Sequence, residues 1–290
     1  MPDFWIHVLG GELVLKDLGD SHWKNMLENN RETFNLGCQG PDPFFYNDFF
    51  PWIKNKRGPK IGTMLHETRT KTLLLESIDY LKKVQNQKNK DFKDLATYFL
   101  GFIVHYVVDK NEHPFIYART TTSDEHKLFE MKLDTYFIKK YWNQKVHLLS
   151  PSSKIDIGKE LPHGVVEYYK NIVPKVFGVK LETDTINDSY NDYKKVFDIF
   201  YSPRGGKRFC LNMLNVIMPI DISICVYPTE VDNSVLSNEE FLEFDNTLKK
   251  AVCEGVKLIN LITAYLKDEI EKSSIEEALH DISFSGRPTN

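Results

Sequence analysis

The stretch from Asp94 to His113, DLATYFLGFIVHYVVDKNEH, decides the fold class. Its apolar residues occupy every face of a helix instead of one stripe, so we expect a helix enclosed by other helices. The uncharged part, residues 95–108, is shorter than the roughly 20 residues that a membrane-spanning helix needs. Pro114 follows, and because proline lacks an amide hydrogen and clashes with the preceding turn, we expect the helix to end there.

Most other segments also repeat their apolar residues at helical spacing, and strand-like alternation is scarce. The final long segment begins with Ser237 and Glu240 at the spacing of a capping box. The sequence therefore predicts an all-α, multi-helix protein. Helices are expected at residues 68–84, 94–113, 124–142, 165–172, 188–200, 207–216 and 237–266.

Residues 143–164 are polar and contain several prolines and glycines, which indicates a connection. The chain of 290 residues is 41% hydrophobic and 13% aromatic, which is enough for a sizeable core. We expect a single domain over residues 1–290, with a metal-binding helical half at 1–145 and a second helical half at 146–290 packed on it.

The charge balance of the chain argues against some partners. With 37 basic and 41 acidic residues the net charge is −4, so attraction to duplex nucleic acid is disfavoured, although a local cationic site remains compatible. The four cysteines are far apart and form no CxxC pair, which argues against a disulfide scaffold or a thiolate zinc site. No obligate protein partner is indicated.

The beginning of the sequence, MPDFWIHVLGG, carries Asp3 and His7 where a signal peptide would need a basic start and an unbroken apolar run. With neither a signal peptide nor a membrane-spanning segment indicated, we expect a cytoplasmic location.

His105, Asp109 and His113 follow one another at intervals of four residues, so one face of the helix should present imidazole, carboxylate, imidazole. A charged Asp in an apolar helix costs several kcal/mol unless it is paired. No Lys or Arg lies among its near helical neighbours on the buried side, whereas a divalent cation would supply the missing charge. Histidine with carboxylate is a ligand set that zinc accepts.

His126 and Glu130 form a second pair with the same spacing. Either pair alone also occurs by chance or as a surface hydrogen bond. Two such pairs within about one helix length, one of them in a strongly apolar helix, favour a metal site.

Three further residues are candidates only in combination with these pairs. His66 is interpreted as lying at the start of a helix, Asp42 lies in a turn rich in Gly and Pro, and His7 lies on the first apolar segment. Alone, His66 could cap its helix, Asp42 could bond its own backbone, and His7 could be a core histidine.

The order of these residues resembles the zinc-dependent phospholipase C family, whose fold is shared with single-strand-specific zinc nucleases. The resemblance covers about the first 130 residues. It implies an all-helical fold with a zinc cluster in a cleft. The residues that match the family's ordered motif are His7, Asp42, His66, His105, Asp109, His113, His126 and Glu130.

The resemblance also implies roles for these residues. Asp42, His66, His105 and Asp109 would hold one zinc ion, and His113, His126 and Glu130 would hold another. Asp109 would bridge toward a third ion near His7, so two or three Zn2+ ions are expected. Asp42 matches the family's candidate general base and would take the proton from an attacking water.

These expectations lead to a zinc-dependent phosphodiesterase of the phospholipase C type. Zinc-bound water loses its proton near neutral pH, and the cationic cluster would attract a phosphate diester. The substrate would be a phospholipid or another phosphodiester. Peripheral contact with a membrane is compatible with such a substrate. A single-strand nuclease-like phosphodiesterase and a non-catalytic zinc-binding protein are the alternatives.

The aromatic residues after Asp42 allow two interpretations of equal weight. They could form an acyl or base-stacking wall beside the metals, or they could wrap the loop onto the core. The residues concerned are Phe44, Phe45, Tyr46, Phe49, Phe50 and Trp52.

Overall fold

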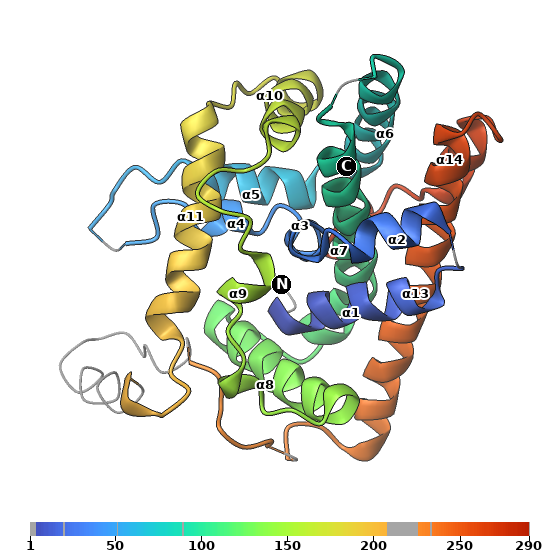
Figure 1. Cartoon of the computed structure of the whole chain (residues 1–290). Helices are drawn as coiled ribbons and strands as arrows, with labels where there is room; N and C mark the ends of the chain where they lie inside the picture. The colour runs from blue at the N-terminus through green and yellow to red at the C-terminus, as the bar shows by residue number, and fades with distance from the viewer. Residues whose placement is uncertain are drawn as a thin grey trace.

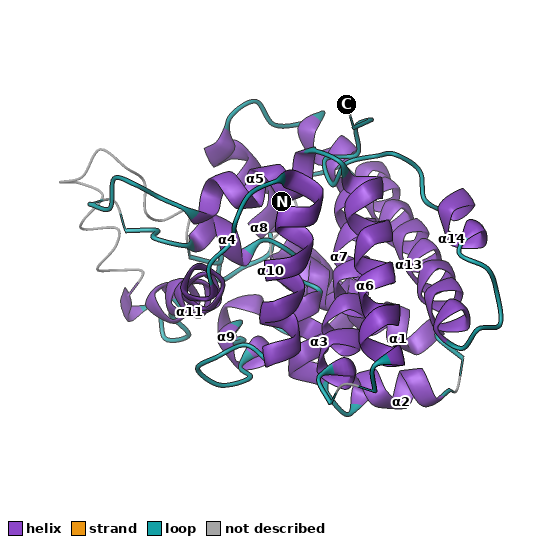
Figure 2. Cartoon of the chain, turned by 90° about the horizontal axis from the view of Figure 1, so that it is seen from above, coloured by secondary structure: helices purple, strands orange, loops and turns teal. Residues whose placement is uncertain are grey.

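A central helix, α7 (Phe92–Tyr117), organises the computed structural model, which describes residues 4–207 except 20, 51 and 89, and residues 226–289 except 233. Helices α1, α3, α6, α8, α10 and α13 all pack against α7 (Figure 1). Viewed from above, α6, α7 and α13 run side by side (Figure 2). The enclosed apolar helix expected from the sequence is therefore present.

Helices are the regular elements throughout the described ranges. One isolated antiparallel bridge joins Ile282 and Pro288, and no strand occurs among the described residues. The all-α prediction is confirmed. The elements are α1 (Phe4–Asp17), α2 (His22–Glu28), α3 (Arg31–Gly37), α4 (Pro43–Tyr46), α5 (Gly58–Glu67), α6 (Thr70–Asn86), α7, α8 (Ser123–Trp142), the 3-10 turn η1 (Val146–Leu148), α9 (Ser152–Ile155), α10 (His163–Phe177), α11 (Thr183–Phe200), α13 (Asn238–Leu266) and α14 (Ser273–Ala278).

Pro114 does not end α7, so that prediction is wrong. The helix continues to Tyr117 with the proline inside it. Phe115 and Ile116 are buried, and the ring of Phe115 packs edge-on against Phe244 of α13 at 5.3 Å between centroids. Burying these two side chains contributes on the order of 3 kcal/mol or more, which offsets the roughly 3 kcal/mol cost of an interior proline.

Capping boxes fix where two of the long helices begin. Ser237 and Glu240 exchange the hydrogen bonds of a capping box at the start of α13, as predicted. Thr122 and Glu125 do the same at the start of α8. Most of the predicted helix at residues 207–216 lies outside the described residues. The predicted connection at 143–164 contains η1 and α9.

Glycines let α3 and α7 approach closely. A Cβ atom on Gly101 would lie 2.3 Å from the carbonyl oxygen of Phe34, and one on Gly37 would lie 2.1 Å from the carbonyl oxygen of Tyr98. Only glycine is tolerated at such a backbone approach. This approach brings the end of α3 beside His105.

Buried hydrophobic residues from both halves of the chain belong to one contiguous cluster. Among the described helices, none is both long and apolar enough to cross a membrane. The single-domain assignment stays a prediction.

Candidate metal centre

Helix α7 presents His105, Asp109 and His113 as one inward-facing column. All three side chains are buried. Nε2 of His105 lies 3.2 Å from Oδ2 of Asp109, and Nδ1 of His113 lies 3.9 Å from Oδ1 of the same carboxylate. The spacing of four residues therefore places both imidazoles beside Asp109, as the helical repeat predicts.

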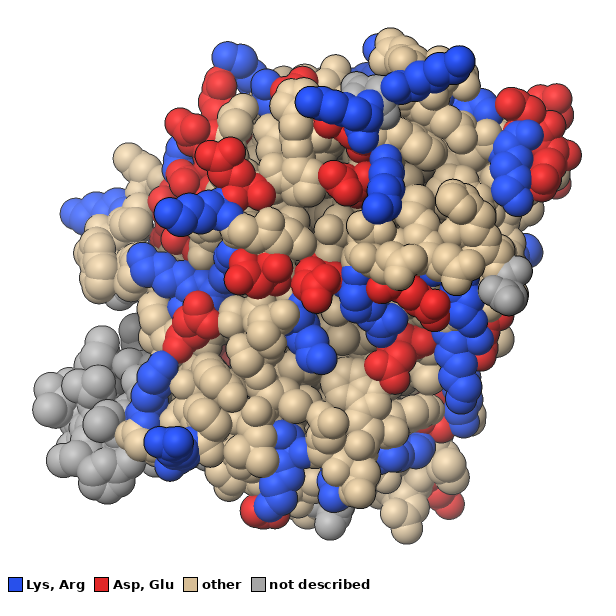
Figure 3. Space-filling view, in the orientation of Figure 1, with Lys and Arg blue, Asp and Glu red and all other residues tan. Residues whose placement is uncertain are grey.

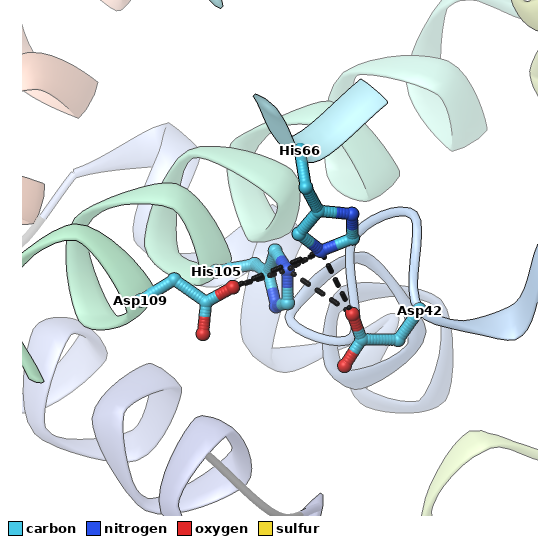
Figure 4. Close-up of side chains that lie close together, drawn as sticks. All are labelled: Asp42, His66, His105 and Asp109. Atoms are coloured by element: carbon cyan, nitrogen blue, oxygen red, sulfur yellow. Dashed lines mark hydrogen bonds and ion pairs between the residues drawn. The ribbon is translucent and has the colours of Figure 1, made fainter. Parts of the chain in front are cut away.

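Asp42 and His66 reach this column from two other elements. Oδ1 of Asp42 lies 3.1 Å from Nε2 of His66 and 3.5 Å from Nε2 of His105. In Figure 4 the carboxylates of Asp42 and Asp109 point toward the imidazoles from opposite sides. One ligand-type atom from each of these four residues lies within 4.8 Å of the others. We call Asp42, His66, His105 and Asp109 the first group.

His66 lies near the end of α5, so the interpretation that it starts a helix is wrong. The helix begins earlier, at Gly58, with Pro59 in the first turn where proline is tolerated. Thr68 then adopts an extended conformation and ends it. His66 does not cap this helix, because its Nδ1 donates to the carbonyl of Gly62 one turn earlier at 2.7 Å.

The turn before Asp42 depends on Gly40. This residue has φ of +50°, and a Cβ atom there would lie 2.2 Å from Cδ2 of the His105 ring. Glycine alone combines a left-handed conformation with so close an approach. The carboxylate of Asp42 makes no capping hydrogen bond to α4, although Asp42 occupies the N-cap position. The turn therefore directs this carboxylate toward the imidazoles.

Backbone carbonyls fix the orientation of both imidazoles in the first group. Nδ1 of His66 donates to Gly62, and Nδ1 of His105 donates to the carbonyl of Cys38 at 3.2 Å. In the neutral form each ring then carries its lone pair on Nε2. The two Nε2 atoms are 3.4 Å apart, so protons on both would place like charges in contact. Such carbonyl partners are the usual second shell of metal-bound histidine.

The first group contains two buried carboxylates whose negative charge a bound cation would balance. Burial raises the pKa of Asp42, but the neighbouring His105 and His66 outweigh burial and leave this pKa below its ordinary value. Burial likewise opposes ionisation of Asp109, yet its histidine neighbours hold its pKa well below the ordinary range. Among the described residues, the ion-pair partners of these two carboxylates are all histidines.

His113, His126 and Glu130 form a second group, with one ligand-type atom of each within 4.8 Å of the others. Nε2 of His126 lies 2.7 Å from Oε1 of Glu130. Nδ1 of His113 donates to the carbonyl of Phe284 at 2.8 Å, so Nε2 is left for another partner. Burial lowers the pKa of His113 to about 3, which keeps this imidazole neutral and available as a ligand.

His7 lies on the other side of Asp109. Its Nε2 is 3.3 Å from Oδ1 of Asp109, and its ring packs on His105 at 4.3 Å between centroids. Asp134 positions the helix that carries His7, because its carboxylate accepts the N–H groups of Trp5 and Ile6 at 3.0 and 2.8 Å. The two oxygens of Asp109 therefore face different groups, Oδ2 toward the first group and Oδ1 toward His7 and His113.

The sequence interpretation did not identify three contributors to this region. Asp134 and the carbonyl of Phe284 orient the histidines from outside the two groups. Glu112 is fully buried, and neither of its oxygens has a hydrogen-bond partner among the described residues. Burial, Asp109 and two further carboxylates raise the pKa of Glu112 well above its ordinary value. In the sequence, only its position three residues after Asp109 could have indicated that Glu112 lies near the metal centre.

The chemistry of the donor set fits zinc. Imidazole Nε2 atoms and carboxylate oxygens converge in two groups that share the neighbourhood of Asp109, and the described part of the chain offers these carboxylates no Lys or Arg. Cys38 belongs to neither group, and burial raises the pKa of its thiol far above the ordinary value. All eight candidate ligands thus lie in or beside this centre.

Comparison with known proteins agrees with this chemistry. The family described as zinc dependent phospholipase C matches residues 6–175, a range that contains all eight candidate ligands. No curated protein and no solved structure matches the chain.

Proposed function

The chain belongs to the zinc-dependent phospholipase C family, and on that premise we propose that it hydrolyses a phosphodiester in the manner of a phospholipase C. The observation that carries the proposal is the convergence of Nε2 of His66, Nε2 of His105 and the Asp42 and Asp109 carboxylates without a Lys or Arg among the described residues. Such a set of lone pairs is stable only around positive charge.

The first group would hold one zinc ion and the second group another, while His7 and Oδ1 of Asp109 would contribute to a third. When bound, zinc supplies positive charge and lowers the pKa of water to near neutrality. Two or three ions carry roughly +4 to +6 against about −3 from Asp42, Asp109 and Glu130, so the centre would attract an anionic diester.

Asp42 is the proposed general base. His105 and Asp109 are fully buried, whereas Asp42 and His66 each keep 4% of their surface exposed. Within the first group, a substrate or water would therefore reach Asp42 and His66 before the enclosed His105 and Asp109. Held between His66 and a backbone turn, its carboxylate would accept the proton of an attacking water and orient that water toward phosphorus.

The test is hydrolysis of bis(p-nitrophenyl) phosphate by the purified zinc-loaded protein. We expect activity that is abolished by a chelator, is restored by zinc, and falls about 100-fold or more in Asp42→Asn. Asp245→Asn is the matched control, since Asp245 is also a buried carboxylate but pairs with Lys140 and Lys249 and belongs to neither group. Activity that survives chelation, or an unchanged rate in Asp42→Asn, would contradict the mechanism.

Two alternatives make different predictions with natural substrates. A single-strand nuclease needs a basic groove, whereas charges of both signs are interspersed on the face seen in Figure 3. A non-catalytic zinc protein closes each ion with four protein ligands, whereas the three residues of the second group would leave one position of their ion open. Assays with short-chain phosphatidylcholine and with single-stranded DNA distinguish these possibilities. A phospholipase C should hydrolyse the lipid, a nuclease should hydrolyse the DNA, and a structural zinc protein should hydrolyse neither.

A phospholipid is the substrate class that the family implies. A cytoplasmic location and independence of a protein partner stay predictions. Contact with a membrane requires a surface that can engage lipid, and one loop beside the centre has this character.

A further inference from the structure

Residues 47–57 connect α4 to α5, the elements that carry Asp42 and His66. The described residues of this loop, all but 51, extend away from the helices at the left of Figure 1 and of Figure 2. Its base is fixed, because Oδ1 of the buried Asn47 accepts the N–H of Gly58 at 3.1 Å. The base of the loop is therefore fixed to the two elements that carry Asp42 and His66.

Trp52 is exposed to an unusual extent at the end of this loop. Its exposed fraction is 71%, the largest among the exposed large hydrophobic side chains of the described residues. Its ring stacks on Phe50 at 4.5 Å between centroids, and Phe50 stacks on Phe49 at 4.1 Å. An exposed aromatic stack of this kind marks an interaction surface. Of the two interpretations of these aromatics, wrapping onto the core applies to Phe44 but not to Trp52.

Positive charge accompanies the stack. Within residues 47–57 there are three cations and one carboxylate, namely Lys54, Lys56, Arg57 and Asp48. Arg57 is paired with Asp48 and Asp188, whereas Lys54 is exposed. Nζ of Lys195, from α11, lies 4.8 Å from the ring centre of Phe50. Asp188 and Asp192 of α11 offset part of this charge, so the tip of the loop is its most cationic part.

This combination suits the surface of a bilayer better than a nucleic acid. Tryptophan is favoured at the level of lipid head groups, and neighbouring lysines add attraction to anionic lipids. Stacking of successive bases needs separate open ring faces. Here the ring of Phe50 already contacts Phe49, Trp52 and Nζ of Lys195, so it is not open to a stacking base.

We propose that the loop at residues 47–57 docks the protein onto anionic phospholipid bilayers by inserting Trp52, with Lys54 and Lys195 facing the head groups. The purpose of this docking rests on the proposed function, because docking would bring the Asp42 side of the metal centre to its lipid substrate. The evidence for docking is independent of catalysis. One indole with a few lysines gives weak, reversible binding that depends on anionic lipid and on salt.

Vesicle sedimentation tests the proposal. Asp42→Asn serves as the background, so that the lipid is not hydrolysed. We expect binding to vesicles of phosphatidylcholine with phosphatidylglycerol, and weaker binding to phosphatidylcholine alone. Trp52→Ala should lower the partition coefficient about tenfold, and Lys54→Gln about fivefold. Leu242→Ala is the matched control, since Leu242 is 60% exposed on α13 and should not affect binding.

A second measurement separates docking from chemistry. Trp52→Ala in the otherwise native protein should hydrolyse bis(p-nitrophenyl) phosphate at the native rate, because this soluble diester needs no surface. Equal vesicle binding by the Trp52→Ala and Leu242→Ala variants would overturn docking through this loop while leaving hydrolysis untouched. Docking would also be overturned if vesicles bound neither the native protein nor the Trp52→Ala variant, while Trp52→Ala abolished binding of single-stranded DNA or self-association measured by light scattering. The loop would then serve one of those interactions and not a bilayer.

Discussion

The carbonyl oxygen of Phe284 accepts a hydrogen bond from Nδ1 of His113 at 2.8 Å, across 171 positions of the chain. The N–H of Phe284 donates to the carbonyl of His66 at 3.1 Å, and its buried ring packs against both His66 and His105. One residue of the C-terminal tail thus contacts histidines of both groups. It also lies outside the range that the family matches.

Replacing Gly286 by alanine should displace this tail. Gly286 has φ of +74°, and a Cβ atom there would lie 2.5 Å from Cγ of Pro114 and 2.8 Å from the carbonyl oxygen of Lys110. We expect lower zinc content after dialysis and a loss of stability of about 2–4 kcal/mol, measured by urea denaturation. Gly178→Ala is the control, because Gly178 has φ of +72° with nothing within 4 Å. It should lose about 1 kcal/mol and keep its zinc. Equal zinc content in both variants would refute a positioning role for the tail.

Gly40→Ala should act on the first group in a more direct way. The new methyl group would overlap the His105 ring, so the imidazole must move away from Asp42 and Asp109. We expect a zinc affinity reduced about 10- to 100-fold, the range found when the surroundings of a ligand are disturbed. Titration with a zinc indicator measures it. Gly205→Ala shares the positive φ without the overlap and should bind zinc normally. Normal affinity in Gly40→Ala would mean that His105 is not a ligand.

The two groups should lose their ions separately. Glu130→Gln removes a ligand from the second group alone, so we expect the protein to lose one zinc ion per chain and to keep the ion of the first group. Asp109→Asn should lose more zinc, because the Asp109 carboxylate faces both the first group and His7. Metal analysis by mass spectrometry after dialysis counts the ions. Identical losses in the two variants would indicate a single cooperative site.

Asp245 provides a test of stability away from the centre. Burial raises its pKa, but hydrogen bonds from Lys249, Tyr141 and Lys140 outweigh burial and lower it below 3.8. A depressed carboxyl pKa contributes stability above the unfolded pKa and loses it as the pH falls through the folded pKa. Asp245→Asn should therefore cost about 1–3 kcal/mol at pH 7. The difference from the native protein should shrink as the pH falls below about 4. Urea denaturation at several pH values measures it, and a difference independent of pH would contradict the assignment.

The sequence by itself determined the helical fold and the core of the centre. Apolar residues on every face of residues 95–108 predict an enclosed helix, and α7 is one. The intervals of four residues that link His105 to Asp109 and His126 to Glu130 predict neighbours on one helix face. Both pairs are in contact. Such relationships follow from the helical repeat, which is a local property of the chain.

Only the tertiary structure decided how the helices end and which distant groups meet. Pro114 is carried inside α7 because Phe115 and Ile116 are buried, and no local rule weighs that burial against the cost of proline. The carbonyls of Cys38 and Phe284 select the free nitrogen of His105 and of His113, although neither residue type indicates such a role. Hydrogen bonding of this kind depends on where the backbone passes, and the backbone path is fixed by packing over the whole molecule.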